Sequence, residues 1–316
     1  MDTATIGRVA RDPRVTGATL AIAALACFAA LDTGTKAIGA MPVAMVMWFR
    51  YAVQTGLTAA TQLPHRGRAL FVTRHPWLQA LRGALLLLTS VAVYLGLRVM
   101  AVGELTAIVM LTPIVLTIVS AFAFGEHVSA ARWSLIALAF AGALMVVRPG
   151  GAGFTASMLL PLLALAANTA FHLVTSKLAK VDDVGTMQLY TGLTGTAIAT
   201  LALPFAWAPV GSLATWALLV MICVLSTLGH GLLITAYARA GIAALAPLLF
   251  GQIAFGTFFA WIVFGHVPDA WALAGICAIS VAGAACMGLS SREKKLAGAR
   301  DVASGQGRNP EARSET

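Results

Sequence analysis

MPVAMVMWFRYAVQTGLTAATQL, residues 41–63, is a long apolar run that carries one permanent charge, Arg50, near its middle. A helix needs about 20 apolar residues to cross the hydrocarbon core of a bilayer. A guanidinium group at that depth costs about 3 kcal/mol or more unless it has a polar partner or a water-filled cavity. The stretch therefore predicts a transmembrane helix in which the surroundings of Arg50 have to be explained.

Apolar runs of this length recur along almost the whole chain. Only 10% of the residues are charged, against about 25% in soluble domains, and the mean hydropathy is +0.86. We predict an all-α, polytopic membrane protein with ten transmembrane helices. The ten runs are residues 17–39, 41–63, 77–98, 101–124, 131–148, 155–177, 184–206, 213–236, 242–264 and 270–289.

Basic residues are distributed unevenly between the two sides of these runs. They gather in the N-terminal arm (1–16), in the loop at 66–74 and in the tail (291–316). Because Lys and Arg favour the cytoplasmic side, we expect a multi-pass inner-membrane protein with both termini in the cytoplasm. The net charge of +9 is then a topology signal, and no nucleic-acid partner is expected. The tail lacks apolar periodicity and is predicted to be disordered.

The two halves of the chain resemble each other at a period near 140 residues. FGEHVSAARW at 124–133 matches FGHVPDAW at 264–271, and further weak matches share the same offset. Each half, 17–150 and 151–290, contains five predicted spans. Since five is odd, the second half must enter the membrane from the opposite side. This predicts an inverted repeat, an architecture of secondary transporters with the substrate site near the midplane.

Short motifs within the first half resemble those of a known family. The segment 81–150 is similar to the first EamA domain of the drug/metabolite transporter superfamily, and 31–51 and 246–283 are similar to other helices of these proteins. The motifs that carry the resemblance are Arg82-Gly83, Thr112-Pro113, Gly125-Glu126 and Arg148-Pro149. Leu249 and His266 depart from the family pattern, because relatives often carry acidic residues at these two positions.

The resemblance implies ten helices and carrier-type transport of a small organic metabolite. Amino acids, nucleobases, S-adenosylmethionine and riboflavin all occur as substrates in the family. We expect alternating access without a cofactor or bound metal. Neither a Gly-x-Ser-x-Gly nor a His-Glu-x-x-His motif occurs, so an enzyme is not expected. A non-coupled channel and an intramembrane enzyme remain the alternatives, and both a monomer and a homodimer are compatible with the sequence.

Ionisable residues inside spans persist only with a partner or a wet cavity, which makes them candidate functional residues. Asp32 and Lys36 lie four residues apart and share a helix face. Asp32 and Arg50 have similar depths below the outer ends of their spans, so we predict an ion pair between them, either structural or substrate-binding. Arg82 lies near the cytoplasmic end of its span, where it either extends to the interface or faces a central cavity.

Polar residues of the later spans are candidates for lining that cavity, although interhelical hydrogen bonding is an equal alternative. His172 and His230 are the deep histidines and can titrate near neutral pH, so proton coupling through them is a hypothesis. The amide and aromatic content favours a neutral or zwitterionic solute. The predicted substrate-binding residues are Asp32, Arg50, Arg82, Tyr94, Asn168, His172, His230 and Gln252.

Overall fold

The structure is a computed structural model that describes residues 13–38, 41–99, 108–109, 111–124, 128–147, 159–265 and 267–303. Within these ranges the chain is helical and contains no strand, which confirms the all-α prediction. The elements are α2 (Pro13–Ile38), α3 (Val43–Arg66), η1 (Gly67–Phe71), α4 (Pro76–Val99), α6 (Thr112–Phe124), α7 (Ala130–Val147), α8 (Leu159–Leu178), α9 (Val184–Ala202), η3 (Leu203–Phe205), α10 (Leu213–Arg239), α11 (Ile242–Leu249), α12 (Gly251–Phe264) and α13 (Ala270–Ala303).

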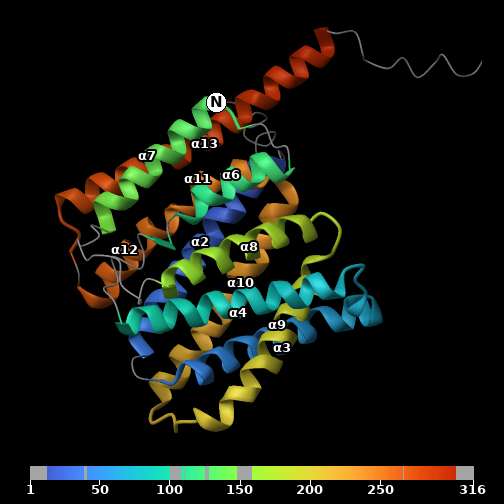
Figure 1. Ribbon diagram of the computed structural model, residues 1–316, viewed down its shortest axis with the longest axis vertical. Helices are drawn as coiled ribbons and strands as arrows, with labels where there is room; N and C mark the ends of the chain where they lie inside the picture. The colour runs from blue at the N-terminus through green and yellow to red at the C-terminus, as the bar shows by residue number, and fades with distance from the viewer. Residues whose placement is uncertain are drawn as a thin grey trace, which may run out of the picture.

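The helices form a bundle in which most pairs of packed helices come from different halves of the chain (Figure 1). α7 packs against α13 at one flank, and α3 packs against α9 at the opposite flank. Between these flanks α2 packs against α10, and α4 packs against α8. α2 also contacts α12, whereas α6 contacts α8 and α11. Helices that follow each other in sequence are therefore seldom the closest neighbours.

Small residues allow several of these pairs to approach closely. Ala18 and Ala21 of α2 are buried together with Leu233 and Tyr237 of α10. A side chain at Gly195 of α9 would overlap the ring of Tyr51 on α3. Membrane helices pack through such contacts, because the lipid tails remove the hydrophobic advantage of larger side chains.

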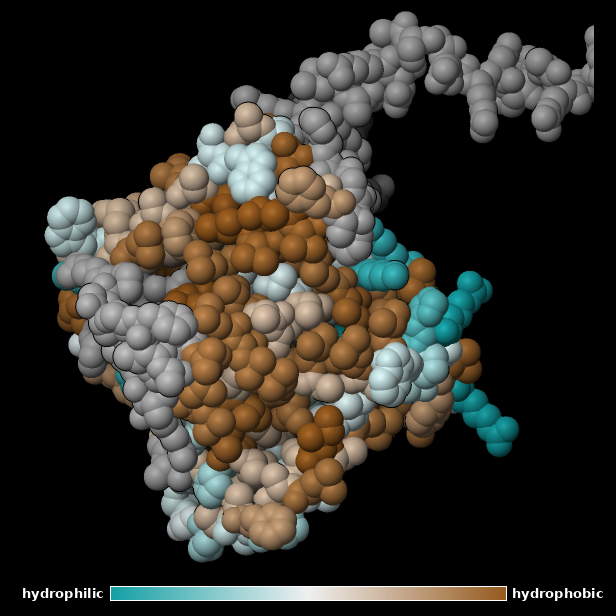
Figure 2. All heavy atoms as spheres, in the orientation of Figure 1, coloured by the Kyte–Doolittle hydropathy of each residue, from teal (hydrophilic) through white to brown (hydrophobic). Residues whose placement is uncertain are grey.

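The outer surface of the bundle is broadly apolar. Figure 2 shows hydrophobic side chains across most of the described part of one face, with hydrophilic side chains at one margin. Phe122, Leu201 and Phe205 are among the large apolar side chains that are mostly exposed. Such a surface suits a protein whose solvent is lipid rather than water.

Five helical segments are long and apolar enough to cross a membrane among the residues that the structure describes. Two shorter apolar helices, Ala130–Met145 and Ala270–Cys286, lie beside them. The ten-span count therefore remains a prediction. The five segments are Val15–Ile38, Pro76–Gly96, Leu159–Leu178, Leu213–Arg239 and Ala244–Phe264.

Two helices extend beyond the predicted spans. α2 begins at Pro13, inside the predicted N-terminal arm, because the fixed φ of proline suits the first turn of a helix. α13 continues to Ala303, so the predicted disorder over 291–303 is wrong. That stretch is rich in Ala, Leu, Glu, Lys and Arg, which are strong helix formers. The remainder of the predicted tail and the motif residues at 125–126, 148–149 and 266 lie outside the described residues.

Candidate functional site

Arg50 lies on α3 and faces α10. One guanidinium nitrogen donates a hydrogen bond of 3.1 Å to Ser226 Oγ, and another lies 3.8 Å from Met47 Sδ. The side chain is only 8% exposed. Its Nε is buried and has no hydrogen-bond partner among the residues that the structure describes. Arg50 is therefore a buried cation held by one hydroxyl group and a weak sulfur contact.

Arg82 lies on α4 and reaches between α8 and α9. Its Nε donates a hydrogen bond of 2.8 Å to Thr175 Oγ1, and a terminal nitrogen donates to Thr191 Oγ1 and, at 3.1 Å, to the Met187 carbonyl. The side chain is 1% exposed. Since Arg82 is enclosed by neutral acceptors, its side chain does not extend to the surface of the bundle. That it faces a central cavity stays a prediction.

Phe171 of α8 connects Arg82 to the two deep histidines. The Arg82 guanidinium carbon lies 5.0 Å from the centre of the Phe171 ring. That ring lies 5.4 Å from the His172 ring and 5.9 Å from the His230 ring, measured between ring centres. The cation–π contact supports the charge only partly. The arrangement places two histidines and a buried arginine around one aromatic side chain.

The two histidines differ in their hydrogen bonding. His172 Nδ1 lies 2.9 Å from the Tyr237 hydroxyl, so this ring is fixed between α8 and α10. His230 is 6% exposed and packs edge-on against Phe28, with ring centres 4.8 Å apart. Neither ring nitrogen of His230 has a hydrogen-bond partner in the described part of the chain. His230 is thus a buried polar ring without a hydrogen bond of normal geometry, although it also interacts with the Ser226 backbone.

The predicted ion pair between Asp32 and Arg50 is not formed. Asp32 instead accepts a hydrogen bond of 2.8 Å from Gln252 Nε2 of α12, whereas Arg50 turns toward Ser226. The prediction assumed that α2 and α3 form a hairpin. In the structure α10 packs against both α2 and α3, and α2 also packs against α12. Lys36 lies on this same side, with its Nζ 5.0 Å from the centre of the Phe264 ring.

Two further predicted cavity residues make hydrogen bonds to other parts of the bundle. The Tyr94 hydroxyl of α4 donates a hydrogen bond of 2.8 Å to the Met41 carbonyl just before α3. Asn168 Nδ2 of α8 lies 3.4 Å from Thr112 Oγ1 of α6. Both contacts are interhelical hydrogen bonds of the kind expected as the alternative to cavity lining.

The centre made by Arg50, Arg82, His172 and His230 contains two buried cations. Among the described residues no carboxylate lies within 4.0 Å of either arginine, although Asp32 is near enough to Arg50 to interact with its charge. Within the described ranges the ion pair that lies within 4.0 Å is Arg66 with Asp183, away from this centre. In the same ranges no group of three or more His, Cys, Asp or Glu side chains is placed to hold a metal ion. The arrangement can attract anions and hydrogen-bond acceptors, and it contains no activated nucleophile.

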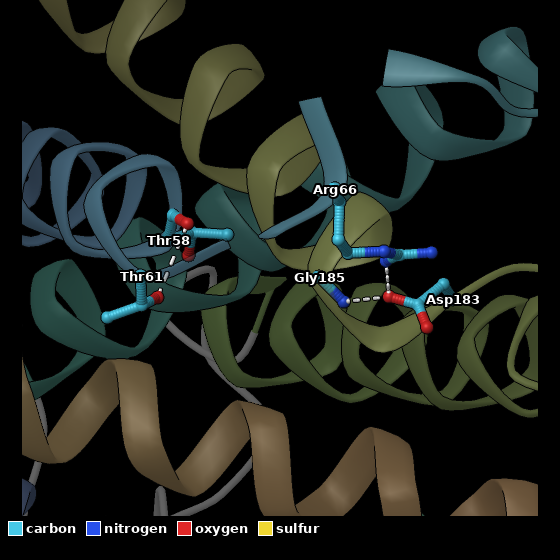
Figure 3. Close-up of polar contacts among 5 residues, drawn as sticks. All are labelled: Thr58, Thr61, Arg66, Asp183 and Gly185. Atoms are coloured by element: carbon cyan, nitrogen blue, oxygen red, sulfur yellow. Dashed lines mark hydrogen bonds and ion pairs between the residues drawn. The ribbon is translucent and has the colours of Figure 1, made fainter. Parts of the chain in front are cut away.

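A second polar cluster joins the end of α3 to the start of α9 (Figure 3). Arg66 forms an ion pair with Asp183, which also accepts a hydrogen bond of 2.8 Å from the Gly185 backbone and so caps α9. Asp182 accepts hydrogen bonds from Thr73 Oγ1 at 2.6 Å and from Gln79 Nε2 at 2.7 Å. These contacts tie the segment 66–79 to the loop before α9, on the side predicted to be cytoplasmic.

Replacing Asp183 tests how much the ion pair contributes beside the helix cap. Asp183→Asn keeps a good capping side chain and removes the charge, so the stability loss should be below about 1 kcal/mol, because both side chains are partly exposed. Asp183→Ala also removes the cap and should cost about 1 kcal/mol more. Melting temperatures of the detergent-solubilised variants measure the difference. Equal losses in both variants would contradict a role of the cap.

Several residues of the centre were missed from sequence. Ser226, Thr175 and Thr191 are hydroxyl residues in apolar helices, a type that usually bonds to its own helix backbone, as Thr191 does with the Met187 carbonyl. Phe171 looks like any apolar core residue. The sequence indicates that the buried arginines need hydrogen-bond acceptors. It does not indicate which helices supply those acceptors.

The amino-acid sequence is similar to those of membrane transporters of small metabolites. No family model matches the chain. It is 28% identical over 242 residues to a riboflavin transporter of Rhizobium johnstonii, covering 76% of this chain and 79% of the relative. It is 26% identical over 284 residues to a pseudopaline exporter of Pseudomonas aeruginosa, covering 88% and 97% respectively.

A solved crystal structure has the same fold, with a TM-score of 0.75 and 21% sequence identity. The superposition covers 89% of this chain and 99% of the other chain. At this identity the likeness concerns the fold alone. Together with the apolar helices and the transporter relatives, it supports the conclusion that the chain is a multi-pass membrane protein similar to transporters of small metabolites.

Proposed function

We propose that the protein is a secondary transporter of the EamA type, in the drug/metabolite transporter superfamily, that moves a small organic metabolite across the inner membrane by alternating access. The observation that carries the proposal is the buried cationic centre of Arg50 and Arg82 with His172 and His230. Ionisable groups at membrane depth mark solute or ion pathways in transporters. The four residues come from α3, α4, α8 and α10, which belong to both halves of the chain.

The packing pattern supports two inverted units, with the boundaries 17–150 and 151–290. Exchanging the halves relates α2 to α8, α3 to α9, α4 to α10, α6 to α11 and α12, and α7 to α13. This exchange turns the α2–α10 contact into the α8–α4 contact and returns α3–α9 and α7–α13 to themselves. The same exchange relates α4–α9 to α10–α3. Such a two-fold relation is what lets one conformation convert into its opposite-facing counterpart.

The substrate is expected to be a small organic solute of the classes carried by similar proteins, among them riboflavin and pseudopaline. One of these relatives is named as an exporter, and both directions of transport are compatible with the fold. The alternative is a non-coupled channel. A buried charge held by hydrogen bonds between helices suits a carrier, in which the helices part and close in turn.

Counterflow into proteoliposomes tests the proposal. Purified protein is reconstituted into vesicles preloaded, in parallel, with riboflavin, S-adenosylmethionine, a nucleobase or an amino acid, and entry of the labelled solute is followed. A carrier gives saturable exchange that is stimulated by the internal solute. Unsaturable flux without stimulation would identify a channel. Correctly oriented, folded protein that exchanges nothing in a wide metabolite extract would contradict the proposal.

Asp32 is the candidate for proton coupling. It lies within the span of α2, its side chain is exposed, and it accepts a hydrogen bond from a neutral amide instead of pairing with a cation. Asp32→Asn keeps the shape and one hydrogen-bond acceptor but cannot exchange a proton. We expect counterflow to persist in this variant and accumulation driven by a pH gradient to disappear. Gradient-driven accumulation equal to that of the unaltered protein would rule out Asp32 as the coupling residue.

A further inference from the structure

We propose that Arg50 and His230 bind an anionic group of the transported solute, a carboxylate or a phosphate. This group supplies the hydrogen-bonded counter-charge that Arg50 does not find among the described residues. The inference rests on the proposed transport function, because it names the substrate class of the same central site. The sequence favours a neutral or zwitterionic solute, and this inference narrows that expectation to a solute that carries an anionic group.

The first observation is the incomplete hydrogen bonding of Arg50. A guanidinium has five N–H donors arranged as a planar fork. Here the fork has one oxygen acceptor, Ser226 Oγ, and one weak sulfur contact, while its Nε remains buried without a partner in the described part of the chain. A fork with free donors matches the two oxygens of a carboxylate or phosphate. The geometry leaves those donors for a ligand.

The second observation is independent of the first and lies one turn along α10. His230 follows Ser226 by four residues, so both side chains lie on the same face of the helix. Both ring nitrogens of His230 are buried, and neither makes a hydrogen bond of normal geometry within the described ranges, although the ring also interacts with the Ser226 backbone. Buried polar groups are nearly always satisfied, and an unsatisfied one calls for an explanation such as a ligand. Because Arg50 bonds to Ser226, a ligand that also contacts Ser226 would meet the face of α10 that carries His230.

A purely structural role explains these observations poorly. A buried charge is costly to desolvate and persists when a partner or a ligand offsets that cost. Arg82 illustrates the structural case, since neutral acceptors from two helices surround it. Arg50 has no comparable set, although it is almost as deeply buried. We therefore assign the ligand to Arg50. Arg82 holds α4, α8 and α9 together through its hydrogen bonds and adds positive potential to the site.

In this conformation the unsatisfied atoms are closed to solvent. The anion therefore enters in a conformation in which α3 and α10 have parted, and it bridges them when they close. This gives the solute charge a direct role in the transport cycle, because the closed state is more favourable with the anion than without it.

Matched pairs of solutes that differ by one anionic group test the inference. Full-length protein in phosphatidylcholine nanodiscs is heated with riboflavin or riboflavin 5′-phosphate, and with glutamine or glutamate, at equal ionic strength. A ligand that binds the folded state raises the melting temperature. In at least one pair we expect the anionic member to stabilise at a concentration about tenfold to a hundredfold lower, the effect of one charge-assisted hydrogen-bonding site.

Variants assign the effect to Arg50. Arg50→Gln removes the charge and still offers a donor to Ser226, so the variant should fold and lose the preference for the anionic member. His230→Phe should weaken the preference for the anionic member. Lys180→Gln removes the same charge from the exposed turn after α8 and should leave the preference intact. If Arg50→Gln does not fold, Arg50→Lys replaces it. A weaker preference for the anionic solute in Arg50→Lys than in the unaltered protein would then assign the preference to Arg50.

The outcomes separate this inference from the proposed function. Absence of an anion preference in every pair, or its persistence in Arg50→Gln, would overturn the inference, even while counterflow of another solute upholds the transporter. Nanodiscs with added phosphatidylglycerol and no solute form a second arm. Stabilisation there that depends on Arg50 would show that a lipid phosphate, and not the solute, supplies the anion, which also overturns the inference.

Discussion

Arg82→Ala is expected to cost about 3 kcal/mol or more of folding stability and to remove most of the protein that survives extraction in mild detergent. The side chain fills the space between α4, α8 and α9 and is 1% exposed. Its truncation leaves a cavity, and the Thr175 hydroxyl and the Met187 carbonyl lose a charged donor. Melting curves followed by size-exclusion chromatography measure the change, which should lower the midpoint by roughly 5–10 °C.

Arg82→Lys is the matched variant. Lysine keeps the charge but has neither the planar fork of donors nor the guanidinium contact with Phe171. The stability of Arg82→Lys should therefore lie between those of Arg82→Ala and the unaltered protein. The Lys180→Gln control removes a cation from the exposed surface and should melt with the unaltered protein. If Arg82→Ala melts at the same temperature as the unaltered protein, the hydrogen bonds of Arg82 do not hold the three helices together.

Gly195→Leu is expected to separate α3 from α9 and to lose the folded protein almost completely. Even a methyl group at Gly195 would overlap the Tyr51 ring, which is itself 1% exposed and has no free space into which to move. Forcing atoms into a filled helix interface typically costs 1–3 kcal/mol for small insertions, and leucine adds three more heavy atoms. The yield of monodisperse protein and its melting temperature report the effect.

Gly56→Ala provides the control for the glycine argument. Gly56 lies on α3, the partner of α9, and a methyl group there meets nothing within 4 Å. Alanine is the better helix former by about 1 kcal/mol, so this variant should be as stable as the unaltered protein or slightly more stable. Loss of folding in Gly56→Ala, or tolerance of Gly195→Leu, would contradict the packing of these two helices.

The sequence predicted the class of structure because hydrophobicity and length act locally. Each apolar run specifies a helix without information from the rest of the chain, which is why α3, α8, α9 and α10 begin within a few residues of the predicted spans. The tail was mispredicted because low hydrophobicity was read as disorder, although residues 291–303 are good helix formers.

The sequence could not predict which helices contact each other, and the partners of the charged residues depend on that. Asp32 was assigned to Arg50 from their similar depth, whereas Gln252 and Ser226 are the actual partners. The pairing of His172 with Tyr237 was missed for the same reason. Tyr94 and Asn168 make hydrogen bonds to Met41 and Thr112, partners that the sequence did not predict.

Arg50 and its hydrogen-bond partner Ser226 lie far apart in the sequence, which affects the order in which the protein assembles during synthesis. Ser226 follows Arg50 by 176 residues. A ribosome that adds about 5–20 residues per second needs roughly 10–35 s to synthesise that length. During this time α3 has already left the ribosome with its charge and without the hydroxyl that later receives it. The nascent protein must therefore keep Arg50 near water or within the insertion machinery, and its final burial is an event of late assembly and not of insertion.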